Sequence, residues 1–297
     1  MEIRRNDELP GAVGIHNLLA DYSLEITPKD LSALQAAKRD LRPGTAVSVT
    51  FLAGDDVGSR LAAARGVRQL GLEPVPHLAA RRMRSAYELE DYLARLSEEA
   101  QIDHVFVIAG DTDRPAGPFN DALSIIRSGL LEKYGVRTVG IAGYPEGHPN
   151  ILDEALWRAL IDKHHALLDH GLSCEITTQF GFDADPFVDW LEELRRRGLE
   201  VPVHLGIAGP AGVKTLLRFA TRCGVGASAK VVAKYGLSIT RLLSKVGPDS
   251  IVDELTERIE PVVHGQVRLH LYPFGGLHEA VEWTKIFSSR EKSRGIL

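Results

Sequence analysis

The sequence predicts an α/β fold, a (β/α)8 barrel of the TIM-barrel type that forms a single domain over residues 1–297. Short runs of β-branched residues alternate with longer segments of helical periodicity, a pattern typical of βα units around a parallel sheet. Eight such runs occur, which is the number of strands in this barrel. No linker rich in Pro, Ser or Gly divides the chain, and its 297 residues suit one large barrel.

The eight expected strands are spread over the whole chain. They cover residues 22–27, 46–51, 74–78, 104–110, 137–143, 174–180, 203–209 and 268–272. A doubly wound open sheet is the main structural alternative. It would usually have fewer parallel strands or a second domain, and no G-x-G-x-x-G sequence follows a strand here. The closed barrel is therefore the favoured fold.

The helix expected after the third strand has the clearest signals. It covers residues 85–100, where Ser85 and Glu88 have the spacing of a capping box. Its leucines recur at helical spacing, so that they lie on one face and can pack against the sheet. These are Leu89, Leu93 and Leu96.

Further helical segments fill the gaps between later strands. One begins at Asp183 or Asp185, the candidate N-caps, and ends at Gly198. A second covers residues 210–224. A long helical stretch over residues 228–264 is expected to add extra helices outside the barrel before the last strand.

The charge of the chain argues against nucleic-acid binding. Its net charge is -5 and its pI is about 6.1, with both signs interspersed along the sequence. A protein that binds a nucleic-acid backbone normally has a basic face and a high pI. The arginine clusters lie next to acidic helix residues, so a solvated helix face explains them better.

Cysteine content and hydropathy indicate a cytoplasmic protein. The two cysteines, Cys174 and Cys223, lack CxxC spacing, so neither a disulfide framework nor a thiolate zinc site is expected. The N-terminus lacks the apolar core of a signal peptide, and no stretch has the roughly 18 apolar residues that cross a bilayer. We expect no membrane partner.

The candidate active site lies where barrels carry it, at the carboxyl ends of the strands and in the loops that follow. Glu25 and Asp111 are the two carboxylates expected at this mouth. Burial can raise one pKa toward neutrality while the other carboxylate stays ionised, an arrangement suited to acid/base chemistry. An equally weighted alternative is that each carboxylate caps a helix or pairs with an arginine. The other polar residues at these ends are Thr50, His77, Tyr144, Glu146, His148 and Gln179.

Two other chemistries of barrels are less well supported. His77 and His148, with Asp111 and Glu146 nearby, invite a metal site, but ligand spacings such as H-x-H or H-E-x-x-H are absent. We expect no metal. A Schiff-base aldolase needs a lysine at a strand end, and none of the eight runs ends in one. The residues alone thus indicate an acid/base or cofactor-dependent enzyme of unnamed substrate.

The chain resembles the methylenetetrahydrofolate reductase family over nearly its whole length. The segments that carry this resemblance occur in the family's order and at similar spacing. They are SLEITP, VSVTF, PVPHLAAR, the GD of VIAGDTDRPAG, GIAGYPEGHP, TTQFGFD and LGIAGPAGVKTLLRF. The resemblance implies a flavin-dependent barrel of the short, bacterial type that converts 5,10-methylenetetrahydrofolate to 5-methyltetrahydrofolate with NADH or NADPH, or runs the reverse oxidation.

The resemblance also implies roles for single residues. Glu25 matches the general acid that protonates the folate N10, and Asp111 matches the carboxylate beside flavin and pterin. Gln179 looks like a substrate-binding residue, and Phe219 like the aromatic that packs against folate or nicotinamide. The residues that match FAD contacts are Thr50, His77, Gly110, Asp111, Phe119, Ala142, Tyr144, His148 and Lys163. Relatives form homo-oligomers, so we expect one here.

Some positions depart from the family's pattern. Ala109 stands where an arginine usually helps to hold the flavin phosphates, and Gly276 stands where an arginine can support the nicotinamide adenine. These departures leave two alternatives open. One is a flavin-free relative in which NADH delivers hydride directly to the folate. The other is a non-catalytic folate-binding subunit that supports a partner enzyme.

Overall fold

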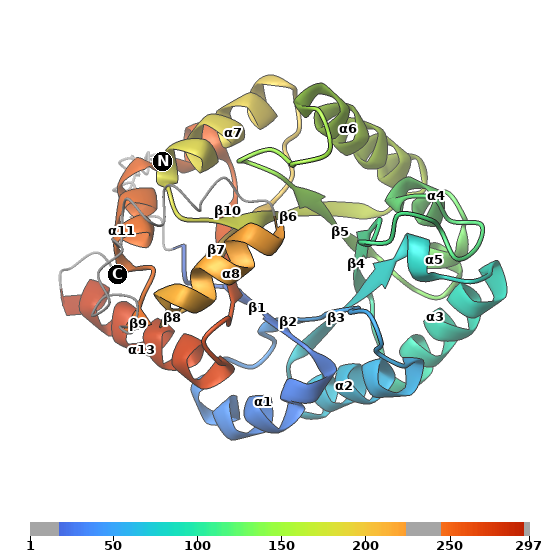
Figure 1. Ribbon diagram of the computed structural model, residues 1–297, viewed down its shortest axis with the longest axis horizontal. Coiled ribbons are helices and arrows are strands. Elements are labelled where there is room, and N and C mark those ends of the chain that lie inside the picture. The colour runs from blue at the N-terminus through green and yellow to red at the C-terminus, as the bar shows by residue number, and fades with distance from the viewer. Residues whose placement is uncertain (1–17, 224–244, 294–297) are drawn as a thin grey trace, which may run out of the picture.

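Eight parallel strands close into a barrel in the computed structural model, which describes residues 18–223 and 245–293 (Figure 1). The order around the barrel is β1-β10-β7-β6-β5-β4-β3-β2. All eight strands expected from the sequence are confirmed. Their bounds are β1 Ser23–Ile26, β2 Ala46–Val49, β3 Glu73–Ala79, β4 His104–Ile108, β5 Thr138–Gly143, β6 Ser173–Gly181, β7 Val203–Ala208 and β10 Val267–Tyr272.

Helices surround the barrel, and α8 lies across its open end in the view down the axis (Figure 1). In the described part of the chain, no helix is both long enough and apolar enough to cross a membrane. The bounds are α1 Leu31–Ala37, α2 Val57–Gln69, α3 Ala86–Ala100, α4 Ala122–Ile126, α5 Leu130–Lys133, α6 Asp153–Asp169, α7 Ala184–Arg196, α8 Val213–Cys223, α11 Asp249–Arg258, α12 Pro261–His264 and α13 Leu277–Ser293.

Period-two alternation places the main core between the strands and the helices. Leu24 and Ile26 of β1 are buried in this outer layer, while Ser23 and Glu25, which alternate with them, point into the barrel. The outer layer holds Val, Leu and Ile from every strand, packed against the apolar faces of the helices. Leu89, Leu93 and Leu96 of α3 are all fully buried there, as their spacing predicts.

The helix caps agree with the sequence in part. Ser85 caps α3 and accepts a hydrogen bond from the Glu88 N–H at 3.0 Å. A capping box also requires the Glu88 carboxylate to accept from the Ser85 N–H, and this part of the prediction is wrong. The carboxylate instead accepts from the Arg84 N–H at 2.6 Å and from the Arg84 guanidinium. The positive charge of Arg84 explains this choice of partner. Asp183 caps α7 as expected, accepting from the Asp185 N–H at 3.2 Å.

The region between β7 and β10 contains structure that the sequence did not predict. β8 (Ala211–Gly212) pairs antiparallel with β9 (Lys245–Val246) in a short ribbon beside the barrel mouth. Two of the expected extra helices, α11 and α12, precede β10 and contact α7. Residues 228–244 of the expected helical stretch and the expected helix end at Gly224 lie outside the described residues.

A β-bulge in β6 brings two backbones unusually close. The pairing with β7 shifts between Thr177 and Phe180, so β6 has one extra residue there. A Cβ added at Gly206 would lie 2.5 Å from the Thr178 carbonyl oxygen and 2.9 Å from the Gln179 carbonyl. Only glycine fits at this approach.

We expect Gly206→Ala to destabilise the fold by about 1–3 kcal/mol, because the backbone atoms that its Cβ meets cannot move aside cheaply. Urea unfolding of both variants measures the effect. Gly212→Ala is the matched control, since nothing lies within 4 Å of a Cβ at that position, and its stability should stay within about 0.5 kcal/mol of the parent. Equal stability of the two variants would contradict the close approach.

Candidate active site at the carboxyl end of the barrel

The interior of this barrel is unusually polar. Barrel interiors are commonly filled by Val, Ile and Leu, yet here the buried inward positions include hydroxyl and imidazole groups. They are Ser23, Ser48, Thr50, His77, His204 and His270. Polar groups cost free energy to bury, so such a concentration marks a place where function overrides stability.

Glu25 lies near the mouth, on the inner face of β1, and pairs in register with Ser48 of β2. Its side chain is 22% exposed, and its Oε2 lies 3.8 Å from Nε2 of His77 on β3. Burial raises the pKa of Glu25 to about 8. Burial also lowers the pKa of His77 to about 3. At neutral pH this contact therefore joins a protonated carboxyl to a neutral imidazole and is not an ion pair.

Asp111 occupies the opposite electrostatic environment at the rim. It follows Gly110, whose φ of +92° gives the loop after β4 a left-handed turn that favours glycine. The Asp111 side chain is 68% exposed and pairs with Arg82 from the turn after β3. Slight burial opposes ionisation, but the hydrogen bond and charge of Arg82 hold the pKa of Asp111 below its ordinary value. No described hydrogen bond or ion pair joins Glu25 to Asp111.

Two tyrosines and a cysteine form the upper wall near Glu25. The Tyr272 hydroxyl donates to the Thr178 carbonyl at 3.0 Å. Burial, together with the charges of Glu25, Tyr144 and Cys223, raises the pKa of Tyr272 well above its ordinary value. Cys223 is the last residue of α8, so this end of the helix approaches the acid. Sequence reasoning missed Tyr272, although its inward position on the last strand was a usable signal.

Aromatic side chains anchor α8 over the strand ends. Phe219 of α8 stacks on Phe274, with ring centroids 4.0 Å apart and planes at 12°. Phe274 meets Phe180 at the end of β6, with ring centroids 4.8 Å apart. Phe219 thus belongs to a small second core beside the mouth. Gln179, in the β6 bulge, is half-buried nearby, and its side-chain oxygen accepts from the Phe180 N–H at 3.2 Å.

The residues matched to FAD contacts fall into two groups. Thr50, Ala142 and Tyr144 follow or lie on strands at the mouth, with His77, Gly110 and Asp111 described above. Thr50 Oγ1 is buried and has no hydrogen-bond partner among the described residues. A bound group with a polar edge would satisfy it.

The second group lies farther from the acid. His148 packs edge-on against Tyr144, with ring centroids 5.4 Å apart. Phe119 is packed in the main core. Lys163 of α6 is partly enclosed near Cys174 and Asp121, and burial lowers its pKa to about 8 although both neighbours oppose the shift.

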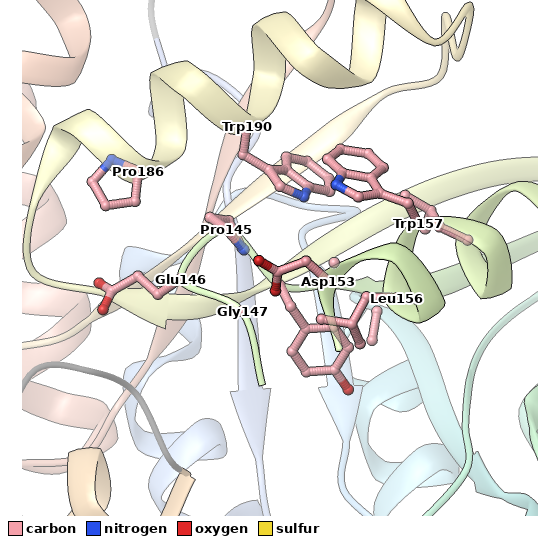
Figure 2. A pocket seen from close by; sticks show the side chains of 12 residues that line it. Pro145, Glu146, Gly147, Asp153, Leu156, Trp157, Pro186 and Trp190 are labelled. Carbon is pink, nitrogen blue, oxygen red and sulfur yellow. The ribbon is translucent and has the colours of Figure 1, made fainter. Parts of the chain in front are cut away.

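A cavity of about 440 Å³ adjoins the mouth between α6, α7 and the loop after β5. Tyr144 and Pro145 are among the residues that line it, and the side chains of Trp157 and Trp190 lie side by side in its wall (Figure 2). The two indole rings stack with centroids 5.4 Å apart and planes at 19°. The wall is thus partly aromatic and suits a planar ring. Sequence reasoning missed both tryptophans, because they lie on helices that the strand-end rule does not inspect.

We expect Glu25→Gln to stabilise the protein increasingly as pH rises from about 5 to 8. The unfolded carboxyl ionises above its ordinary pKa of 4.5, whereas the folded one keeps its proton up to about 8. The raised folded pKa contributes stability below pH 4.5 that is lost as pH rises to 8, and an uncharged glutamine avoids this loss. The gain should grow by up to about 1.4 kcal/mol per pH unit.

Thermal unfolding across this pH range measures the gain, with the exposed Glu98→Gln on α3 as the control for loss of a carboxylate. A pH-independent difference between Glu25→Gln and the parent would show that Glu25 is not held protonated by burial.

Comparisons with known proteins point to one family. Residues 25–279 match the family model described as methylenetetrahydrofolate reductase. Methylenetetrahydrofolate reductase 2 of Saccharomyces cerevisiae is 30% identical over 146 residues, covering 46% of this chain and 24% of the yeast protein. Methylenetetrahydrofolate reductase (NADH) 1 of Arabidopsis thaliana is 26% identical over 217 residues, covering 68% of this chain and 36% of the plant protein.

The alignments thus span about a quarter to a third of the length of these curated relatives. Among solved structures, dihydropteroate synthase from Thermus thermophilus superposes over 90% of this chain and 92% of its own, with 14% identity and a TM-score of 0.48, which adds nothing to the fold evidence of the sheet itself. The family match, by contrast, extends from the candidate acid Glu25 on β1 to the start of α13. The chain belongs to the methylenetetrahydrofolate reductase family.

Proposed function

We propose that this protein reduces 5,10-methylenetetrahydrofolate to 5-methyltetrahydrofolate, with NADH or NADPH as the hydride donor and FAD as the carrier. The observation that carries the proposal is the largely enclosed Glu25, whose pKa of about 8 lets it keep a proton at neutral pH at the mouth of a barrel of this family. The curated relatives bear the name of this activity. The reverse oxidation would use the same residues.

Glu25 is suited to act as the general acid. Opening the five-membered ring of the substrate leaves charge on the folate N10, which needs a proton as the bond breaks. A carboxyl with a pKa of about 8 is mostly protonated at pH 7 and can donate it. The imidazole of His77 is neutral and lies 3.8 Å away. It therefore adds no positive charge that would favour the ionised carboxylate and lower the pKa of Glu25.

Asp111 is suited to the complementary task. Ring opening creates a positively charged iminium, which a nearby carboxylate stabilises. Arg82 keeps Asp111 ionised by lowering its pKa. The Arg82 guanidinium also neutralises part of the negative charge of Asp111. Stabilisation of the iminium therefore depends on how far Arg82 moves away from Asp111 when substrate binds.

The mouth has features that fit the ring system of FAD. Thr50 contributes a buried hydroxyl without a partner among the described residues, and Gly110 and Ala142 are small enough for a flat ring to approach the backbone. Tyr144, His148 and Lys163 would face the rest of the molecule. FAD, when bound, supplies the redox chemistry between nicotinamide and folate. The protein orients it, excludes water and holds the proton on Glu25.

A specific observation favours a second candidate, direct hydride transfer from NADH to the folate without flavin. Ala109 has no side chain to offer a phosphate, and its carbonyl accepts the Arg81 N–H at 2.9 Å. Arg82 is committed to Asp111. Phosphates near this loop would therefore have fewer partners than a strong flavin site needs.

An absorbance spectrum of the purified protein tests the choice between these candidates. We expect a yellow protein whose flavin band bleaches on anaerobic addition of NADH and recovers on addition of methylenetetrahydrofolate. A colourless protein that still oxidises NADH with methylenetetrahydrofolate would replace the FAD proposal with the second candidate. Absence of folate-dependent NADH oxidation, with or without added FAD, would overturn the reductase activity itself.

We expect Glu25→Gln to separate the two half-reactions. Bleaching of the flavin by NADH needs no acid and should stay within about twofold of the parent, whereas folate reduction should slow at least about a hundredfold. Stopped-flow absorbance measures both steps, and Glu98→Gln is the control. Unchanged folate reduction in Glu25→Gln would remove Glu25 from the mechanism.

A further inference from the structure

A line of polar side chains, two of whose contacts are hydrogen bonds, runs through the interior of the barrel. Ser23 of β1 lies at its centre, with its Oγ 2.8 Å from Nδ1 of His270 and 3.3 Å from Nδ1 of His204. His204 is on β7, which does not neighbour β1 in the sheet, so the contact crosses the interior. All three side chains are at most 6% exposed.

The line continues downward to the amino end of the barrel. Nε2 of His204 lies 3.6 Å from Glu175 of β6, and the other oxygen of this carboxylate lies 2.9 Å from Nε2 of His104 on β4. Burial opposes ionisation of Glu175, but the two imidazoles beside it hold its pKa well below the ordinary value. His104 and Glu175 line a cavity of about 260 Å³, whose wall also includes His204 and Ser23.

That cavity opens at the amino end. Its rim includes Asp21 and Arg42, whose side chains are 53% and 67% exposed and form an ion pair. Water and buffer can therefore reach the lower end of the line. His204 bridges this end to Ser23 through its two ring nitrogens, one on each side.

Upward, the line approaches the candidate acid. Burial and, after it, the charges of His204 and His77 lower the pKa of His270 to about 3. No described hydrogen bond joins His270 to His77, so a relay along this line needs a bridging water at this step. His77 then reaches Glu25 at 3.8 Å.

Every member of the line can both accept and release a proton. An imidazole takes a proton on one nitrogen and releases one from the other, and a hydroxyl or carboxyl does the same through oxygen. No lysine, arginine or amide interrupts the sequence from Glu175 to Glu25. A purely structural polar core would satisfy its groups locally and would not need to connect solvent at one end with the active site at the other.

We propose that the line Glu175–His204–Ser23–His270–His77 returns protons to Glu25 from the amino end of the barrel while ligands cover the mouth. The proposal rests on Glu25 acting as the acid of the proposed function. In each cycle Glu25 loses one proton to the folate N10, and one proton from water enters beside Glu175. Each imidazole accepts a proton at one ring nitrogen as it releases one from the other, and a ring rotation restores its first tautomer.

Ser23→Ala tests the proposal because it removes the central hydroxyl without altering Glu25. Glu25 begins the first cycle already protonated, so a single turnover of bound methylenetetrahydrofolate should proceed within about twofold of the parent rate. Later turnovers wait for a new proton. We therefore expect a burst of one product per active site, followed by a steady-state rate at least about tenfold lower with a larger solvent deuterium isotope effect.

Two variants serve as controls. Ser48→Ala makes the same change on the neighbouring strand. Ser48 is a buried residue that lines the same cavity but has no described hydrogen bond to the line, so this variant should keep the parent's steady-state rate. Ser23→Thr keeps the hydroxyl and should restore multiple turnovers. Should Ser23→Ala fail to fold, His204→Gln keeps hydrogen-bonding groups of similar reach but cannot pass a proton, and it should give the same burst.

A steady-state rate unchanged in both Ser23→Ala and His204→Gln would overturn the relay and show that Glu25, which is 22% exposed, takes protons directly at the mouth. Equal slowing of the first and later turnovers would also overturn it, in favour of a structural role. Failure of the underlying proposal, that Glu25 is the acid, gives a different result. In that case Glu25→Gln would retain a full single turnover, whatever the Ser23 variants do.

Discussion

Burial of the Glu25 carboxyl is the constraint on which the site depends. Taking this group out of water raises its pKa to about 8 and makes it a proton donor at neutral pH. The same burial costs stability above pH 4.5, the ordinary pKa of the group, and the neutral His77 beside it adds a further polar group to the interior. The apolar layer between strands and helices, with Leu24 and Ile26 flanking Glu25 on β1, supplies the stability that tolerates this cost.

The two ends of the barrel divide the electrostatic tasks. At the carboxyl end, burial raises the pKa of Glu25 to about 8 while Arg82 holds the pKa of Asp111 below its ordinary value. Under the proposed function, proton donation and cation stabilisation are therefore assigned to different groups. At the amino end, the buried Glu175 stays ionised between two histidines. The pKa values of Glu25 and Glu175 are thus shifted in opposite directions inside one barrel. Among the described residues no hydrogen bond offsets the burial of Glu25, whereas two imidazoles offset that of Glu175.

The fold was predictable because each of the eight strands can be recognised from its own short run of β-branched residues. This recognition does not depend on which strands lie beside it in the barrel. Glu25 and Asp111 were found by a positional rule for strand ends. Tyr272, His204 and His270 were missed, because contacts across a barrel depend on the order of the strands and on their register, which no local pattern contains. The β6 bulge beside Gln179 and the stacking of Trp157 on Trp190 depend on tertiary contacts in the same way.

The protonation state of Glu25 is the most direct test of this account. Infrared difference spectra between about pH 5 and pH 9, for the parent and for Glu25→Gln, isolate the carbonyl stretch of this one protonated carboxyl. In the parent protein we expect a band that is absent from the variant and that disappears with a midpoint near pH 8. A band that is lost with a midpoint below about 5, close to an ordinary glutamate, would contradict it.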